Sequence, residues 1–133
     1  MAFLGEGCFG KVFKEKIDGV TCAVKKIPNY RRNGMEEAEM LMDLDNVYII
    51  KCLSHHTENG GSLLCIVMEF ADKGTMDTYI KRQASNSDSV SFKEYNIWRS
   101  LCHLAIALDY LHTRHPHILH LSLIHISEPT RPY

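Results

Sequence analysis

The sequence predicts an α+β fold, in which an antiparallel sheet with one helix is followed by a helical segment. Short β-prone runs flank the turn dipeptide Asp18-Gly19, and two further apolar runs of strand length occur before residue 70. A long helix is predicted after residue 91, because its apolar residues recur with a 3.6-residue period. At 133 residues and 45% hydrophobic content, the chain is long enough for one core of ordinary density.

The first strands adjoin a glycine-rich segment, GEGCFGKV, at residues 5–12. We predict a strand from Lys11 to Lys16, a tight turn at Asp18-Gly19 that requires positive φ, and a second strand from Val20 to Ile27. The segment NYRRNG at residues 29–34 is expected to break the pattern before a helix over MEEAEMLMDLD at residues 35–45. In that helix Glu37 shares one stripe with Leu41 and Leu44, so the carboxylate needs a partner.

Two apolar runs, VYIIKCL at residues 47–53 and SLLCIVMEF at residues 62–70, are predicted to be strands that complete the sheet. The turn-rich sequence SHHTENGG separates them. Residues 71–83 are typical of a connector and a short helix. Ser91 and Glu94 have the spacing of a capping box at the start of the longest helix, which we expect to end near Pro116. Its apolar stripe comprises Ile97, Leu101, Leu104, Leu108 and Leu111.

Composition excludes several classes of function. Fifteen basic and sixteen acidic residues give a formal charge of -1, so no general attraction to nucleic acid or to an anionic membrane is expected. Five scattered cysteines without a CxxC pair favour reduced thiols over a disulfide framework. No signal peptide or membrane-spanning run is evident. We therefore expect a cytoplasmic or nuclear protein.

The spacing Gly5-x-Gly7-x-x-Gly10-x-Val12 indicates phosphate binding, because glycines let a backbone approach a polyphosphate without obstruction by Cβ atoms. A dinucleotide-binding fold shares this spacing but requires a helix to begin at the third glycine. The β-prone run that follows Gly10 instead favours a loop between two strands.

Two further residues complete this pattern. Ala23 and Lys25 lie two apart on a strand and so face the same side, which places a small residue and an ammonium group together. Glu37 is the candidate ion-pair partner of Lys25, with Glu36 and Glu39 as alternatives.

GEGCFGKV, CAVKK, the helix with Glu37 and LCIVMEFADKGTM, in this order, resemble the N-terminal lobe of a eukaryotic protein kinase over residues 3–120. LCIVMEF and EYNIW are most similar to the NIMA-related serine/threonine kinases. The resemblance implies a five-stranded antiparallel sheet plus one helix at residues 1–70, and a hinge with the first helices of an incomplete C-lobe at residues 71–120. Where the family usually has His-Pro-Asn before the fourth strand, this chain has Asn46, Val47 and Tyr48.

The resemblance also implies a site for ATP with Mg²⁺. Lys25 and Glu37 would be the catalytic pair, and Met68 would be the gatekeeper beside adenine. Glu69 and Ala71 would offer hinge backbone groups. The residues expected to surround the nucleotide are Leu4, Gly5, Glu6, Gly7, Cys8, Phe9, Gly10, Val12, Ala23, Lys25, Met68, Glu69 and Ala71. The expected partners are ATP and a protein substrate.

No protein metal site is predicted. His112, His115, His117 and His120 are closely spaced, but no cysteine or carboxylate lies among them to complete a zinc site. Cys8 is interpreted as a tolerated residue and not as a reactive thiol, because reactivity requires a lowered pKa.

The family's catalytic sequence stops at His120. The expected Arg-Asp-Leu is replaced by Leu121-Ser122-Leu123, and no Asp-Phe-Gly occurs anywhere. Codons for residues 121–131 can be written as the transposon-end adapter of sequencing libraries, so we interpret residues 121–133 as a non-native tail. Genomic DNA that encodes LSLIHISEPTRPY in frame would contradict this interpretation.

Two functional hypotheses follow. The first is the ATP-binding part of a protein serine/threonine kinase that is inactive as this chain, because the catalytic-loop Asp and Asn and the Asp of Asp-Phe-Gly are absent. The alternative is a non-catalytic short isoform or pseudokinase that binds a nucleotide or a partner. Since the family packs the long helix against further C-lobe helices, its apolar stripe is expected to be exposed here and to promote aggregation.

Overall fold

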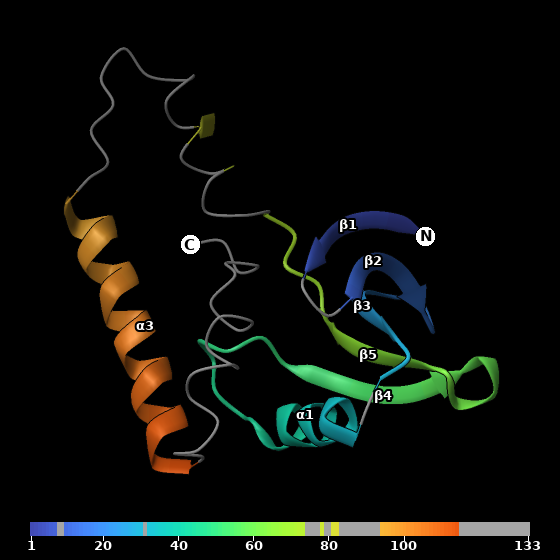
Figure 1. The fold of residues 1–133 in the computed structure, drawn as a ribbon. Coiled ribbons are helices and arrows are strands. Elements are labelled where there is room, and N and C mark those ends of the chain that lie inside the picture. Colours follow the sequence, from blue (N-terminus) through green and yellow to red (C-terminus); the bar gives the residue numbers. More distant parts are fainter. Residues whose placement is uncertain (8–9, 31, 74–77, 79–80, 83–93, 115–133) are drawn as a thin grey trace. The chain divides into compact units, whose positions relative to one another are not determined.

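The computed structural model describes residues 1–7, 10–30, 32–73, 78, 81–82 and 94–114 (Figure 1). The chain divides into two compact units. The first comprises residues 1–45 and 51–70, and the second comprises residues 46–50 and 71–133.

The first unit is built on a five-stranded antiparallel sheet. Its strands are β1 (Ala2–Gly7), β2 (Gly10–Ile17), β3 (Val20–Pro28), β4 (Cys52–Glu58) and β5 (Leu63–Glu69). Their order across the sheet is β1-β2-β3-β5-β4, so the last two strands form a hairpin that adds to β3 through β5. This confirms the predicted sheet.

The turn between β2 and β3 has the predicted geometry. Asp18 and Gly19 have φ values of 49° and 82°, and Ile17 pairs with Val20 on either side of them. Positive φ at both central residues matches the right-handed twist of the flanking strands. The register that this turn sets continues along β2 and β3 to the pair Lys11 and Lys26.

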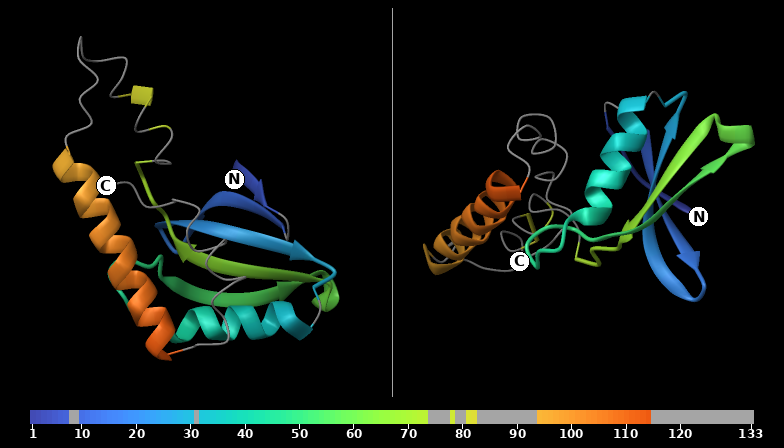
Figure 2. Two further views of the ribbon diagram at one scale, coloured as in Figure 1. Left: turned by 60° about the vertical axis from the view of Figure 1, so that its left-hand side comes forward. Right: turned by 90° about the horizontal axis from the view of Figure 1, so that it is seen from below.

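Helix α1 (Arg32–Asp43) lies on one face of the sheet, as the right-hand view of Figure 2 shows. We call this the helix face and the opposite one the outer face. The prediction of a helix from Met35 placed its start too late. The chain breaks at Asn29, where φ is 49° and the backbone amide donates to the Ser62 carbonyl at 2.9 Å, which leaves room for an earlier first turn.

The prediction for the fourth strand was also misplaced. We expected residues 47–53, but β4 is Cys52–Glu58, and residues 54–58 had been assigned to a turn. The polar residues of β4 form a strand because the backbone of β5 supplies their hydrogen-bonding partners, which does not require apolar side chains. The connection itself is η1 (Asn59–Gly61), with positive φ at all three residues.

Strand alternation divides the core of the first unit between the two faces. On the helix face, Ala38 of α1 packs with Ile27, Cys52, Leu64 and Ile66. The outer-face cluster comprises Cys22, Val24, Cys65 and Val67.

The second unit contains α3 (Glu94–Arg114), which confirms the predicted long helix and its end shortly before Pro116. Ser91 and most of residues 71–83 lie outside the described residues, so the predicted cap and short helix stay predictions. Ala107 and Leu111 are buried, whereas Ile97, Leu101 and Leu104 are 43–51% exposed. The apolar stripe of α3 is therefore largely exposed to solvent.

The departure at residues 46–48 forms a local turn in the second unit. Asn46 accepts hydrogen bonds from the backbone amides of Tyr48, through Oδ1 at 2.9 Å, and of Ile49, through its carbonyl at 3.1 Å. The Tyr48 ring stacks on His103 of α3 with a centroid distance of 4.2 Å and an interplanar angle of 21°. This segment therefore holds α3 through a ring contact that the sequence pattern did not predict.

Candidate functional site

The predicted nucleotide residues of the first unit occupy two neighbouring rows on the helix face. Gly5 of β1 pairs with Val12 of β2, and Val12 pairs with Lys25 of β3. In the next row Ala23 of β3 pairs with Met68 of β5. Side chains two apart on a strand share a face, so the antiparallel register brings together residues far apart in sequence.

Lys25 is positioned from two sides. The strand β3 directs its side chain to the helix face, and α1 brings Glu37 within reach, with 3.5 Å between Lys25 Nζ and Glu37 Oε1. The two side chains are only 13% and 26% exposed, so this ion pair is shielded from much of the solvent.

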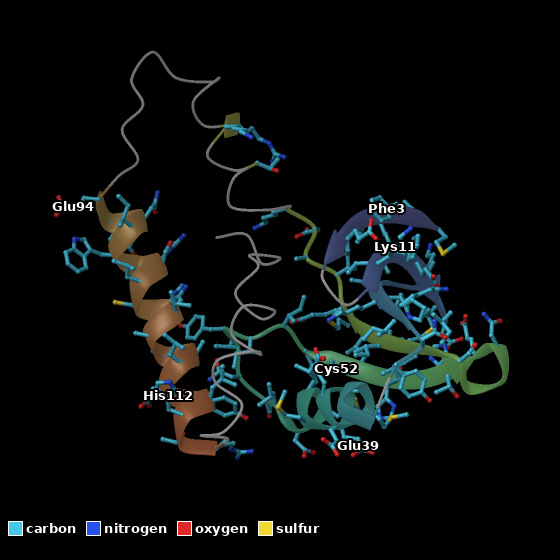
Figure 3. The ribbon with its side chains drawn as sticks, in the orientation of Figure 1. Phe3, Lys11, Glu39, Cys52, Glu94 and His112 are labelled. Carbon is cyan, nitrogen blue, oxygen red and sulfur yellow. The ribbon has the colours of Figure 1, made fainter. Side chains whose placement is uncertain are left out.

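The geometry distinguishes Glu37 from its two rivals. Glu36 and Glu39 are exposed, and Figure 3 shows Glu39 on the side of α1 that is turned away from the sheet. Leu41, one turn after Glu37, packs on the helix-face core. The stripe that predicted an inward-facing carboxylate is thus present in the structure.

The three glycines of the motif have different environments. A Cβ atom built on Gly5 or Gly7 would meet nothing within 4 Å, so both backbones are open to a ligand. A Cβ atom on Gly10 would lie 2.4 Å from the Lys26 carbonyl oxygen, which no real side chain tolerates. Gly10 is therefore required by the packing of β2 on β3, a reason that the motif alone did not reveal.

A β-bulge lies beside the glycines. The pairing of β1 with β2 shifts between Phe3 and Gly5, so Leu4 is the extra residue, and its side chain is 46% exposed. Bulges are frequent next to functional sites because they redirect side chains. No feature of the sequence predicted it. Glu6 follows on β1 and is exposed, and Cys8 and Phe9 lie outside the described residues.

At the far end of the second row, Met68 is partly buried against the helix-face core and pairs with Cys52 of β4. Burial raises the pKa of the Cys52 thiol, which keeps it neutral in this apolar surrounding. The wall formed by Ala23, Met68 and Cys52 is consequently apolar and uncharged.

The end of β5 is fixed to the residue before β4. The Glu69 amide donates to the Lys51 carbonyl at 2.9 Å, and the Lys51 amide donates to Glu69 Oε1 at 2.9 Å. The Glu69 amide is thereby committed within the sheet, and a hinge role for the backbone groups of Glu69 and Ala71 stays a prediction. Ala71, the other predicted hinge residue, belongs to the second unit and is partly exposed.

Sequence reasoning missed a second set of charged contacts. Lys26, next to Lys25, faces the outer side and reaches Glu15 Oε1 at 3.1 Å and Glu58 Oε2 at 3.8 Å. The hydrogen bond to Glu15 raises the pKa of Lys26, against an opposing effect of burial. The alternation of strand residues was the signal from which this could have been found.

Comparisons with known proteins agree with this architecture. The sequence model of the protein tyrosine and serine/threonine kinase family matches residues 1–124, so the match ends inside the predicted tail at residues 121–133. No helix within the described residues is long and apolar enough to cross a membrane.

Several relatives carry the name of the NIMA-related group that the sequence predicted. The probable serine/threonine-protein kinase nek1 of Dictyostelium discoideum is 32% identical over 117 residues, which cover 84% of this chain and 23% of the relative. The serine/threonine-protein kinase Nek3 of Oryza sativa subsp. japonica is 32% identical over 125 residues, covering 88% and 20% respectively. The chain thus spans less than a quarter of the length of these relatives. Given the match over almost its whole length, this chain belongs to the protein tyrosine and serine/threonine kinase family.

Proposed function

We propose that the first unit is the ATP-binding part of a protein serine/threonine kinase, and that the parent protein transfers the γ-phosphate of ATP to protein hydroxyl groups. The observation that carries the proposal is the shielded ion pair between Lys25 and Glu37, together with two glycines of β1 whose backbones are open. In the family a lysine of this kind holds nucleotide phosphates only while the glutamate orients it.

The residues of this chain fit a bound nucleotide. The Lys25 ammonium would neutralise the phosphates, and the amides near Gly5 and Gly7 would approach them without obstruction by a Cβ atom. Val12, Ala23 and Met68 would supply apolar walls for the adenine ring. Mg²⁺ would neutralise and orient the phosphates when bound, but the family residues that would hold it are absent from this sequence.

We further propose that this chain binds ATP without transferring phosphate. Transfer requires a carboxylate that accepts the proton of the substrate hydroxyl, and the residues after His120 do not provide the family's aspartate. Binding and catalysis are therefore separable here.

The binding test compares Lys25→Met with Lys16→Met in an equilibrium titration with a fluorescent ATP analogue. Loss of one charge-assisted contact weakens binding by roughly tenfold to 100-fold, so Lys25→Met is expected to raise Kd by that factor. Lys16 is an exposed lysine on β2 and serves as the matched control. Lys26→Met is unsuitable because it would remove the partner of Glu15. Equal Kd values for the two variants would contradict the proposed site.

The same titration tests the orienting acid. Glu37→Gln is expected to weaken binding, because Lys25 would lose the charge that holds it, whereas Glu39→Gln is expected to leave Kd unchanged.

Incorporation of labelled phosphate into a protein substrate by this chain would contradict the separation of binding from transfer.

A further inference from the structure

Three potential metal ligands meet on the outer face of the sheet, on the side opposite α1. His56 of β4 pairs directly with Cys65 of β5, and Glu58 follows two residues later on the same face of β4. The ligand atoms of the three side chains lie within 4.8 Å of one another. This cluster has no role in the proposed nucleotide site.

For two of the three ligands the spacing is close to that of ligands around one ion. His56 Nε2 and Glu58 Oε1 are 3.3 Å apart, and two such atoms bound tetrahedrally to Zn²⁺ would be separated by about 3.4 Å. Imidazole nitrogen, carboxylate oxygen and thiolate sulfur are the three donor types that Zn²⁺ takes from proteins. Mg²⁺ and Ca²⁺ take oxygen donors instead, so this set selects against them.

The pairing of β4 with β5 already brings the three residues that carry the donors close together. All three residues lie on two adjacent strands, His56 and Glu58 on β4 and Cys65 on β5, and the pairing of these strands extends from Cys52 with Met68 to Glu58 with Leu63. Cys65 is fully buried, whereas the side chains of His56 and Glu58 are 48% and 42% exposed. An ion could therefore enter from solvent between the two exposed donors and reach the sulfur beneath them.

Lys26 opposes a cation here, because its ammonium group contacts Glu58. Its shorter contact, however, is with Glu15 at 3.1 Å, and its contact with Glu58 is longer at 3.8 Å and uses Oε2. Glu58 Oε1, which faces His56, is the oxygen that an ion would take. Lys26 can thus keep Glu15 as its partner when Glu58 turns to a metal.

The thiol must lose its proton to bind. Burial raises the pKa of Cys65, and the Glu58 charge raises it further, while Lys26 lowers it. A divalent ion reverses this balance, because its own charge is the largest in the site and a coordinating thiol is deprotonated outright. Binding is accordingly expected to release a proton.

We propose that His56, Glu58 and Cys65 form a zinc site that fastens β4 to β5, with water as the fourth ligand. Three protein ligands leave one position open to water, but because the ligands come from both strands, a bound ion would tie β4 to β5 without any dependence on nucleotide.

The test uses Co²⁺ as a spectroscopic probe in the 133-residue chain with Cys8→Ser and Cys102→Ser, which remove two thiols outside the cluster. Tetrahedral Co²⁺ bound to a thiolate gives a sulfur-to-metal charge-transfer band in the near ultraviolet. Zn²⁺ is expected to displace the Co²⁺ and so to abolish this band. His56→Asn is expected to weaken Co²⁺ binding at least tenfold, since even the loss of an outer-shell partner costs about that much. His55→Asn is the matched control, because the neighbouring side chain points to the opposite face.

Cys65→Ala should abolish the charge-transfer band. Cys65 is fully buried, so its substitution can disturb folding. Glu58→Gln therefore provides a second variant of a ligand, at a partly exposed position. Circular dichroism reports whether each variant is folded. Hydrogen exchange gives an independent readout: Zn²⁺ is expected to slow exchange in peptides from β4 and β5 of the parent chain but not of His56→Asn. The proposal is overturned if no charge-transfer band forms, if it persists in folded Cys65→Ala, or if His55→Asn and His56→Asn weaken binding equally.

Discussion

Replacement of Gly10 by alanine tests whether this glycine serves packing or only the nucleotide. The added Cβ atom would lie 2.4 Å from the Lys26 carbonyl oxygen and 3.2 Å from Ile27 Cγ1, whereas ordinary contact begins at 3.4 Å. The atom that it meets first belongs to the backbone of β3 and cannot rotate away. The strands must then separate by about 1 Å, next to the pair Lys11 and Lys26.

Overpacking of this kind costs about 1–3 kcal/mol, and alanine in place of glycine returns about 0.4–1 kcal/mol through the unfolded chain. For Gly10→Ala the net loss of stability is expected to be about 1–2 kcal/mol. Gly7→Ala, whose Cβ atom meets nothing within 4 Å, is expected to be neutral or slightly stabilising. The two variants should therefore differ by about 2 kcal/mol, which corresponds to roughly 30-fold in an opening equilibrium.

Hydrogen exchange followed by mass spectrometry suits this comparison. The single tryptophan, Trp98, lies on α3 in the second unit and is 60% exposed, so its fluorescence does not report on the sheet. Peptides from β2 and β3 of Gly10→Ala are expected to exchange roughly 30-fold faster than those of Gly7→Ala. Equal exchange in the two variants would refute the steric argument and return Gly10 to a role in ligand binding alone.

Three further outcomes are expected. Gly19→Ala should lower the free energy of unfolding by about 1 kcal/mol in urea titration, because φ is 82° there and alanine is strained in that region, and an unchanged midpoint would contradict the observed turn. In a brief treatment with iodoacetamide at pH 8, mass spectrometry should find Cys102 modified before Cys52, because Cys102 is exposed while burial raises the pKa of the Cys52 thiol and reduces its thiolate fraction; faster modification of Cys52 would count against the buried position. Leu104→Glu should reduce light scattering by the purified chain, since Leu104 is 43% exposed on the apolar stripe of α3, and unchanged scattering would assign aggregation to another surface.

The sequence predicted most of the sheet because its strongest signals are local. The Asp18-Gly19 turn fixes the register of β2 and β3, and the apolar run of β5 fits a strand buried on both faces. It failed for β4, where partners on β5 make a strand of polar residues, and at the start of α1, where the positive φ of Asn29 completes the break early and the helix begins at Arg32. Both errors arise where a neighbouring segment determines the backbone and local propensity does not.

The candidate site was predictable in its residue types but not in its geometry. The sequence places Glu36, Glu37 and Glu39 on one short helix. The helical period favours Glu37 as the inward-facing residue, because the apolar Leu41 lies one turn later on the same side. The packing role of Gly10 could not be predicted, because a glycine is expected both where a backbone approaches a phosphate and where two strands lie very close together. The packing role is seen only in the short distance between a Cβ atom built on Gly10 and the Lys26 carbonyl oxygen.

The two adjacent lysines explain how one strand serves two separate faces. Because successive side chains alternate, Lys25 meets Glu37 on the helix face while Lys26 meets Glu15 on the outer face. A one-residue slip of β3 would exchange them, placing Lys26 at the predicted phosphate site and Lys25 beside the cluster of His56 and Cys65. The turn before β3 prevents this slip, so its glycine supports both the proposed nucleotide site and the proposed zinc site without touching either.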